Sequence, residues 1–315
     1  MILFVIRRLL QGAVLLVLLS VVVFLMIYLA PGDAAQFAIS QRANEAEIQR
    51  FRQQMGLDLP WYRQYARLAG NWARLSFGDS IIQRRPVGEV IMQRLPRTVE
   101  LLALSIVLSL LLAIPIGLIS AIKQYSFWDH LVTVFSFIGI AMPSFFLAIL
   151  LILVFAVQLH WLPTQGAQTI GEEGNLVDHV KHLILPVLVL TLIRTAGWSR
   201  YIRSSMLEVL RQDYVRTAKA KGLPQRLVLA RHAFRNAMIP LITLLGLSLP
   251  ELVAGAIVTE QIFSWNGLGQ LIVTSASKRD TPVVLALTLL SGGAVIIGNL
   301  IADVGYGLAD PRIRL

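Results

Sequence analysis

The 315-residue sequence contains no cysteine, which excludes both a disulfide framework and a thiolate metal site. Charged residues are scarce, at 15% of the chain against about 25% in soluble domains. The H-E-x-x-H zinc motif, the G-x-S-x-G nucleophile elbow and any clustered carboxylate pair are also missing. We therefore expect neither a soluble globular domain nor a self-contained enzyme.

A G-x-x-x-x-G-K-[ST] phosphate loop is missing as well, so the chain is not expected to bind ATP in the usual way. We expect no other cofactor on this chain. The net charge of +10 could indicate nucleic acid as a partner. In a membrane protein, however, Lys and Arg accumulate on cytoplasmic loops as topology signals, so nucleic-acid binding is not expected.

Apolar residues are abundant, at 56% of the chain, and they form long runs. A helix needs about 20 apolar residues to cross the roughly 30 Å of bilayer hydrocarbon. The weakest candidate is the fourth, which is short and has Arg194 near one end. We predict an all-α integral membrane protein with six transmembrane helices. The expected spans are Leu9–Ala30, Val99–Ile122, Val132–Val157, Leu183–Trp198, Ala237–Val258 and Val283–Tyr306.

The first apolar run could be a cleaved secretory signal or a permanent helix. Arg7 and Arg8 form a basic start, and small residues follow from Ala30. Its apolar core is longer than the roughly 7–15 residues of a cleaved signal, so we favour an uncleaved helix. Basic residues also flank the other end of the chain, at Arg312 and Arg314. With an even number of spans, both termini are predicted to be cytoplasmic.

The same charge rule assigns the loops to sides of the membrane. The segment Tyr201–Asn236 is strongly basic and is predicted to be cytoplasmic, as is the short connection Lys123–Leu131. The acidic loop Gln158–His182 is placed outside. Pro31–Thr98 carries many arginines, but loops longer than about 60 residues are exempt from the rule, so it also fits outside.

Within this long outer segment, Glu45–Met55 has the pattern of an amphipathic helix with Ile48, Phe51 and Met55 on one face. Four aromatic residues follow closely. They would suit either anchoring at the membrane interface or a cap that receives an external partner. These residues are Trp61, Tyr62, Tyr65 and Trp72.

A few polar residues invite a functional interpretation. His179 and His182 could share a helix face, but a polar role at the interface is favoured over metal binding. Glu251 follows Pro250 inside the fifth span. It could line the transport path and contact the amino end of a peptide, or it could lie near the outer surface if the helix breaks at Pro250. Asp303 more simply pairs with an arginine.

The basic segment is predicted to contain two helices. The first runs from Ser204 to Gly222, where Gly222-Leu223-Pro224 ends it, and the second covers Gln225–Ala237. Small residues at 218, 220 and 222 would let another surface approach closely. Such a basic hairpin suits insertion into a groove on a soluble partner. Alternatively, the charge only fixes the orientation in the membrane.

This segment resembles the permease subunits of binding-protein-dependent ABC importers, specifically the peptide/nickel branch. Against the E-A-A-x3-G coupling signature, Arg216-Thr217-Ala218 stands in place of Glu-Ala-Ala, so only the second Ala (Ala218) and Gly222 match. Further motifs of the branch occur in order along nearly the whole chain. They are Pro31-Gly32-Asp33, Met55-Gly56-Leu57-Asp58-Leu59-Pro60, Phe77-Gly78-Asp79-Ser80, Arg203-Ser204-Ser205-Met206, Arg231 to Pro240, Ile262-Phe263-Ser264-Trp265-Asn266-Gly267-Leu268-Gly269 and Asp310-Pro311-Arg312-Ile313-Arg314.

The resemblance implies a type I ABC importer permease fold in the inner membrane of a bacterium or archaeon. Its core would be residues 95–306, with the helix 1–30 and the outer segment 31–98 as additions. The loop 200–236 would couple to the ATPase. The coupling residues implied are Tyr214, Val215, Ala218, Lys219, Ala220, Lys221 and Gly222.

The resemblance also implies partners: a second similar permease subunit, two ATPase subunits that carry ATP and Mg, and an external solute-binding protein. ATP-driven closure of the ATPases would move the coupling helix and alternate the access of the path. Short peptides are the expected substrate, with glutathione or a nickel chelate as alternatives. Two other classes of protein are alternatives. A secondary transporter or channel would work without an ATPase, and a membrane-anchored scaffold would need no solute path.

Overall fold

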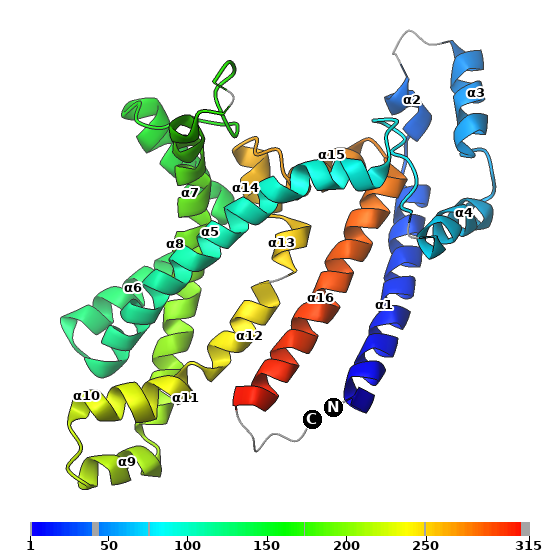
Figure 1. Ribbon diagram of the computed structural model, residues 1–315. Coiled ribbons are helices and arrows are strands. Elements are labelled where there is room, and N and C mark those ends of the chain that lie inside the picture. The colour runs from blue at the N-terminus through cyan, green and yellow to red at the C-terminus, as the bar shows by residue number, and fades with distance from the viewer. Residues whose placement is uncertain (1, 40–43, 75, 173, 249, 310–315) are drawn as a thin grey trace. The chain divides into compact units, whose positions relative to one another are not determined.

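The computed structural model describes residues 2–39, 44–74, 76–172, 174–248 and 250–309, and within these ranges the regular secondary structure is helical (Figure 1). Five helices are long and apolar enough to cross a membrane, or six spans if one bent pair is counted. The predicted all-α membrane architecture is therefore confirmed. The ending at 310–314, with Arg312 and Arg314, lies outside the described residues.

The chain folds into two compact units. One contains residues 1–99, 250–261 and 265–296, and the other contains 100–249, 262–264 and 297–315. The boundary falls inside helix α5 (Val87–Ile122), which starts twelve residues before the predicted second span because Val87, Val90 and Ile91 are buried.

In the first unit, α1 (Ile2–Leu29) packs closely against α16 (Thr281–Ala309). A Cβ atom at Gly12 would lie 2.7 Å from the side chain of Ile296, and one at Gly292 would lie 2.7 Å from that of Leu16. Glycine at these two positions is therefore what lets the apolar helices approach each other, as small residues do in membrane helix pairs.

The outer segment forms three short helices: α2 (Ala34–Ala38), α3 (Glu45–Met55) and α4 (Trp61–Ala73). The bounds of α3 agree with the prediction. Phe51 is 6% exposed and packs with Ala35 and Ile81, which confirms the predicted apolar face. Asp33 accepts a hydrogen bond from the backbone N–H of Ala35 at 2.9 Å, which caps α2.

Two polar contacts fasten this segment. The Arg52 guanidinium donates to Asp33 through Nε at 2.8 Å and Nη2 at 2.5 Å, which joins α3 to the start of α2. Tyr65 on α4 lies 2.7 Å from the Ser20 hydroxyl of α1, and its ring lies edge-on to Phe24. Trp61 and Tyr62 instead remain about half exposed. The aromatic residues are thus divided between an attachment to α1 and an outward surface.

Two consecutive residues between α15 (Leu268–Ser277) and α16 complete the attachment. Arg279 donates to the carbonyls of Pro31 at 2.5 Å and Gly32 at 3.1 Å, just after α1 ends. The buried carboxylate of Asp280 accepts hydrogen bonds from the Ser80 hydroxyl and, at 3.0 Å, from the backbone N–H of Ile81. A single turn therefore holds both ends of the outer segment.

Burial raises the pKa of the Asp280 carboxyl, against the opposing effect of its hydrogen bonds from Ser80 and the following backbone. A carboxyl with a raised pKa binds its proton more tightly in the folded state than in the unfolded state. Its contribution to stability is then lost as the pH rises from about 3.9 through the raised value. We expect Asp280→Asn to flatten this part of the pH dependence. Apparent melting temperatures of wild type and variant, measured between pH 4 and pH 8, should converge toward the acidic end, and parallel curves would contradict this.

In the second unit, α6 (Phe127–Ala141) is followed by α7 (Ser144–Leu151) and a π-helical turn, η1 (Ile152–Gln158). The predicted span over Val132–Val157 is bent, because the chain turns by 103° between Ala141 and Ser144. The cause is Pro143, which lacks a backbone N–H and forces Met142 into an extended conformation (ψ 120°).

The fourth span is also longer than predicted. Helix α8 covers Leu176–Leu210, whose 35 residues extend over roughly 52 Å, well beyond the hydrocarbon. Pro186 lies inside it and does not end it. The predicted short span Leu183–Trp198 therefore captured only its most apolar part.

The fifth span is broken rather than continuous over Ala237–Val258 as predicted. It consists of α12 (Ile239–Ser248), α13 (Glu251–Ala254) and α14 (Ile257–Ile262). Pro250 starts α13, and Gly255 ends it with a φ of +80°, a left-handed conformation that favours glycine. Pro250 itself has helical backbone angles (φ −57°, ψ −34°), so the irregular backbone between α13 and α14 lies at Gly255.

Candidate functional site

The basic segment after α8 folds into a helical hairpin (residues 211–237), which we call the coupling hairpin after the role that the sequence resemblance predicts for it. Helix α9 (Asp213–Ala220) forms its first arm. A turn follows in which Gly222 has a φ of +75° and Pro224 starts the second arm. That arm is continuous through α10 (Gln225–Leu227), the π-helical η2 (Val228–Phe234) and α11 (Arg235–Ala237). The predicted turn and second helix are confirmed.

The predicted first helix, Ser204 to Gly222, is wrong in one respect. The chain leaves the helix at Arg211 and at Gln212, which is extended (ψ 148°), before α9 begins. This break lets α9 turn away from α8 instead of prolonging it. In Figure 1, α9 and α10 face each other beyond the end of α8.

An apolar core of its own holds the coupling hairpin together. Val215 and Val228 are fully buried and Ala218 is 6% exposed, and these three residues pack with the last turn of α8 and with Leu223. The sequence predicted Ala218 as a small residue open to a partner. The structure instead uses its small size inside the chain, where a larger side chain would separate the two arms.

The base of the coupling hairpin is fastened to α5 and α8. Ala121, Met206, Ala233 and Ala237 form a second buried cluster, so both long helices contact the second arm. The Ser205 hydroxyl also donates to the carbonyl of Ala237 at 2.9 Å. Buried side chains therefore join the second arm directly to both long helices.

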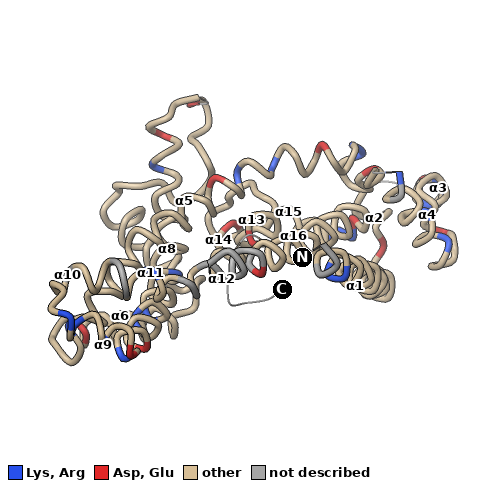
Figure 2. The backbone as a smooth tube through the Cα atoms, turned by 60° about the horizontal axis from the view of Figure 1, so that its bottom comes forward, with Lys and Arg blue, Asp and Glu red and all other residues tan. Residues whose placement is uncertain are grey.

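The remaining residues of the predicted coupling set lie on the outward face of α9 and in the turn that follows it. Lys219, Ala220, Lys221 and Gly222 are exposed, and nothing in the described chain lies within 4 Å of a Cβ placed at Gly222. Tyr214 is 43% exposed, and its hydroxyl accepts a hydrogen bond from Asn236 at 3.0 Å. Figure 2 shows the Lys and Arg positions gathered at this end of the unit. The hairpin thus offers a positively charged surface with a small-residue tip.

A buried ion pair fixes the helices above the hairpin. Asp129 on α6 accepts two hydrogen bonds from Arg203 on α8, at 2.7 Å from Nε and 2.9 Å from Nη2. The same carboxylate accepts from the Ser120 hydroxyl of α5 at 2.5 Å and from the backbone N–H of Tyr125 at 2.9 Å. One side chain therefore joins α5, α6 and α8. Sequence reasoning missed it, because its partners lie up to 74 residues away.

A second buried carboxylate was missed in the first unit. Glu260 on α14 is fully buried and accepts hydrogen bonds from the Thr98 hydroxyl at 2.9 Å and the backbone N–H of Gln270 at 3.0 Å. Thr98 in turn accepts from the N–H of Leu268 at 2.7 Å. A Cβ at Gly267 would lie 2.4 Å from the Thr98 oxygen, so glycine is required there. The available signal in the sequence was an acid shortly before the Ile262–Gly269 motif.

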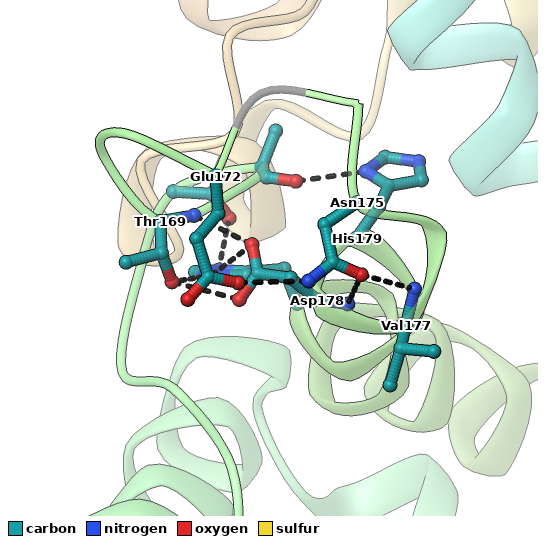
Figure 3. Close-up of polar contacts among 9 residues, drawn as sticks. Thr169, Glu172, Asn175, Val177, Asp178 and His179 are labelled. Carbon is teal, nitrogen blue, oxygen red and sulfur yellow. Dashed lines mark hydrogen bonds and ion pairs between the residues drawn. The ribbon is translucent and has the colours of Figure 1, made fainter.

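The predicted outer loop is held against the start of α8 by a polar cluster (Figure 3). Asp178 accepts hydrogen bonds from both the N–H and the hydroxyl of Thr169 at 2.7 Å, and Asn175 caps the helix. The ring of His179 lies between the Ala167 carbonyl at 2.8 Å and the Glu100 carboxylate at 2.7 Å. His182 is buried beside Gly166. The two histidines thus fasten the loop, and the described residues contain no group of three metal-type ligands.

Glu251, the proposed path residue, is exposed and begins α13. Both interpretations of its role stay predictions. Asp303 lies near the end of α16 and is half-buried.

Comparisons with known proteins agree with this architecture. Residues 113–315 match the model of the family described as binding-protein-dependent transport system inner membrane component, and residues 1–102 match that of the N-terminal part of such membrane components. The oligopeptide transport system permease protein AppB of Bacillus subtilis is 44% identical over 312 residues, covering 99% of each chain. The glutathione transport system permease protein GsiC of Escherichia coli K12 is 40% identical, covering 99% of this chain and 98% of that protein. With five or six apolar spans among the described residues and full-length similarity of this kind, the chain belongs to the inner-membrane permease family of binding-protein-dependent transport systems.

Proposed function

We propose that this chain forms the path for short peptides together with a second, similar permease subunit, and that ATPase subunits dock on α9. The observation that carries the docking is the coupling hairpin. It has its own buried core, a basic outer face and a rigid attachment to α8. The peptide substrate is supported by the 44% identity to an oligopeptide permease.

The contacts favour a mechanical link between docking and the path. ATP and Mg bound to the partner ATPases would supply the energy, and this chain would receive it as a displacement of α9. The buried cluster around Met206 would pass that displacement to α5 and α8, and the Asp129–Arg203 pair would carry α6 with them. Two packed arrangements of these helices would then expose the path to opposite sides of the membrane.

Glutathione is the second candidate substrate. The 40% identity to a glutathione permease over nearly the full chain supports it. Glutathione is itself a small peptide with a γ-linkage, so a path that accepts short peptides would suit both. Choice between them would then lie with the external binding protein.

The test is reconstitution of the complete complex in lipid vesicles with its external binding protein. We expect the chain to co-purify with ATPase subunits, and we expect ATP hydrolysis and peptide uptake to rise when loaded binding protein is added. Uptake that persists without an ATPase would indicate a secondary transporter or channel instead. A complex that hydrolyses ATP but moves glutathione and no α-linked peptide would favour the second candidate.

Gly222 allows a sharp prediction about docking. Gly222→Val is expected to lower the ATP hydrolysis stimulated by binding protein at least fivefold. A β-branched residue is strained at a φ of +75° and places bulk at the exposed tip. The measurement is stimulated hydrolysis by the purified complex at equal subunit stoichiometry.

Gly222→Asn is the matched control for the backbone, because asparagine tolerates the left-handed conformation better than other residues. If only conformation matters, the asparagine variant should retain most of the stimulation. If the tip must be small for docking, both variants should lose it. Full stimulation with valine would refute the assignment of α9 as the docking element.

A further inference from the structure

A polar pocket of about 330 Å³ opens in the first unit where the start of α5 lies beside α15 (Figure 1). The hydrophobic cluster of Val87, Leu268 and Leu271 packs the same helices together, so the walls of the pocket are firmly held. The predicted topology places both elements on the outer side of the membrane. Its polar lining includes Gln83, Arg94, Gln270, Thr274, Lys278 and Asp280.

Two cations line this pocket, Arg94 and Lys278. Within the described residues, neither Arg94 nor Lys278 forms a salt bridge; Arg94 is half-buried, and Lys278 is exposed at the end of α15. The buried Glu260 attracts Arg94 through space, but its oxygens already accept hydrogen bonds from Thr98 and from the backbone. A half-buried guanidinium that lacks a bonded anion is suited to binding one from outside.

The remaining polar groups favour an anion of modest size. The described chain engages neither the side-chain amide of Gln83 nor that of Gln270 in a hydrogen bond, and amides can donate to a carboxylate. The one acid of the lining, Asp280, directs its oxygens to Ser80 and the backbone N–H of Ile81.

We propose that this pocket binds the terminal carboxylate of the peptide as it enters the permease, with Arg94 and Lys278 as the charged ligands. The inference rests on the proposed peptide transport. Every linear peptide with a free carboxyl end carries this group whatever its sequence, and the pocket has room for a chain end. If Arg94 and Lys278 bind this carboxylate, peptides with different side chains would all enter in the same orientation.

The test compares peptides that differ only at the carboxyl end. Uptake of one short peptide and of its C-terminal amide is measured in vesicles holding the complete complex, at subsaturating peptide delivered by the binding protein. Arg94→Gln and Lys278→Gln are each expected to lower uptake of the free acid five- to tenfold and that of the amide less than twofold. Arg63→Gln, which removes an exposed charge from α4 outside the pocket, should leave both unchanged.

The cysteine-free chain permits a second readout by chemical rescue. Lys278→Cys should show the same selective loss, and aminoethyl methanethiosulfonate should restore uptake because the product resembles lysine in length and charge. The sulfonatoethyl reagent, which adds a negative charge, should lower uptake of the free acid further. The wild-type complex treated with each reagent controls for cysteines in the partner subunits.

Three results would overturn the proposal. Equal losses for the acid and the amide, with weaker stimulation of ATP hydrolysis by binding protein, would show that the pocket docks an acidic side chain of that protein. Unchanged uptake in both glutamine variants would show that the pocket binds no transported group. Rescue by both reagents alike would exclude a role for the charge. Failure of the wild-type complex to transport any peptide would instead refute the proposed function.

Discussion

Replacing Asp129 with alanine is expected to destabilise the protein by about 3 kcal/mol, because it removes one partner of a buried ion pair. The carboxylate is 5% exposed and serves four donors, which are two nitrogens of Arg203, the Ser120 hydroxyl and the N–H of Tyr125. Water can reach Arg203 in part, since its side chain is 27% exposed. The loss should therefore fall at the lower end of the range for buried pairs.

The measurement is thermal unfolding of the purified chain in detergent, alone and in the complete complex. The double variant Asp129→Ala with Arg203→Ala should lose less than the sum of the two single losses, because the second change removes the unpaired charge. Asp213→Ala breaks an exposed pair with Arg216 in the same unit and should have no measurable effect. If the Asp129→Ala variant had the same melting temperature as the wild type, the ion pair would not stabilise the fold.

The same variant should also separate ATP hydrolysis from transport. Asp129 joins α5 and α6 to α8, the helix that leads into the coupling hairpin. Without this carboxylate, α9 could still dock on the ATPase, but a displacement of α8 would move α6 less. We therefore expect the number of peptides moved per ATP to fall. Losses of hydrolysis and uptake in equal proportion would indicate only a smaller folded fraction.

The sequence was sufficient to predict the features that depend on local composition. The apolar runs were sufficient to locate the membrane spans approximately. The spacing of Ile48 and Phe51 predicted α3 with its observed bounds. The Gly222-Leu223-Pro224 turn follows from the conformations that glycine and proline permit. Helix ends were less accurate, because burial of residues such as Val87 extends helices beyond their apolar runs.

What could not be predicted are contacts between residues far apart in the chain. Nothing near Val215 or Ala218 reveals that Val228 covers them, so the inner and outer faces of α9 were indistinguishable in the sequence. The 103° bend at Pro143 was equally hidden, since proline inside α8 at Pro186 produces no break. Whether a proline ends a helix depends on the packing around it.

Glu260→Ala is expected to have the largest effect in the first unit, with a loss of about 4 kcal/mol. Because the side chain is fully buried, the substitution leaves the N–H groups of Gln270 and Ala256 without an acceptor and also creates a cavity. Each unsatisfied buried donor costs about 1–3 kcal/mol, and the cavity adds to that loss. The expected result is a sharply reduced yield of folded complex and a lower apparent melting temperature.

Glu260→Gln distinguishes hydrogen bonding from packing, since glutamine fills the same space. The groups around the carboxylate are all donors, namely the Thr98 hydroxyl and the N–H groups of Ala256 and Gln270. A glutamine amide can accept through only one oxygen, so its NH2 group must face a donor. The loss should be about 2 kcal/mol, between wild type and the alanine variant. A glutamine variant as stable as the wild type would mean that packing alone fixes α14 against α15, whereas one as unstable as alanine would assign the whole effect to the two accepting oxygens.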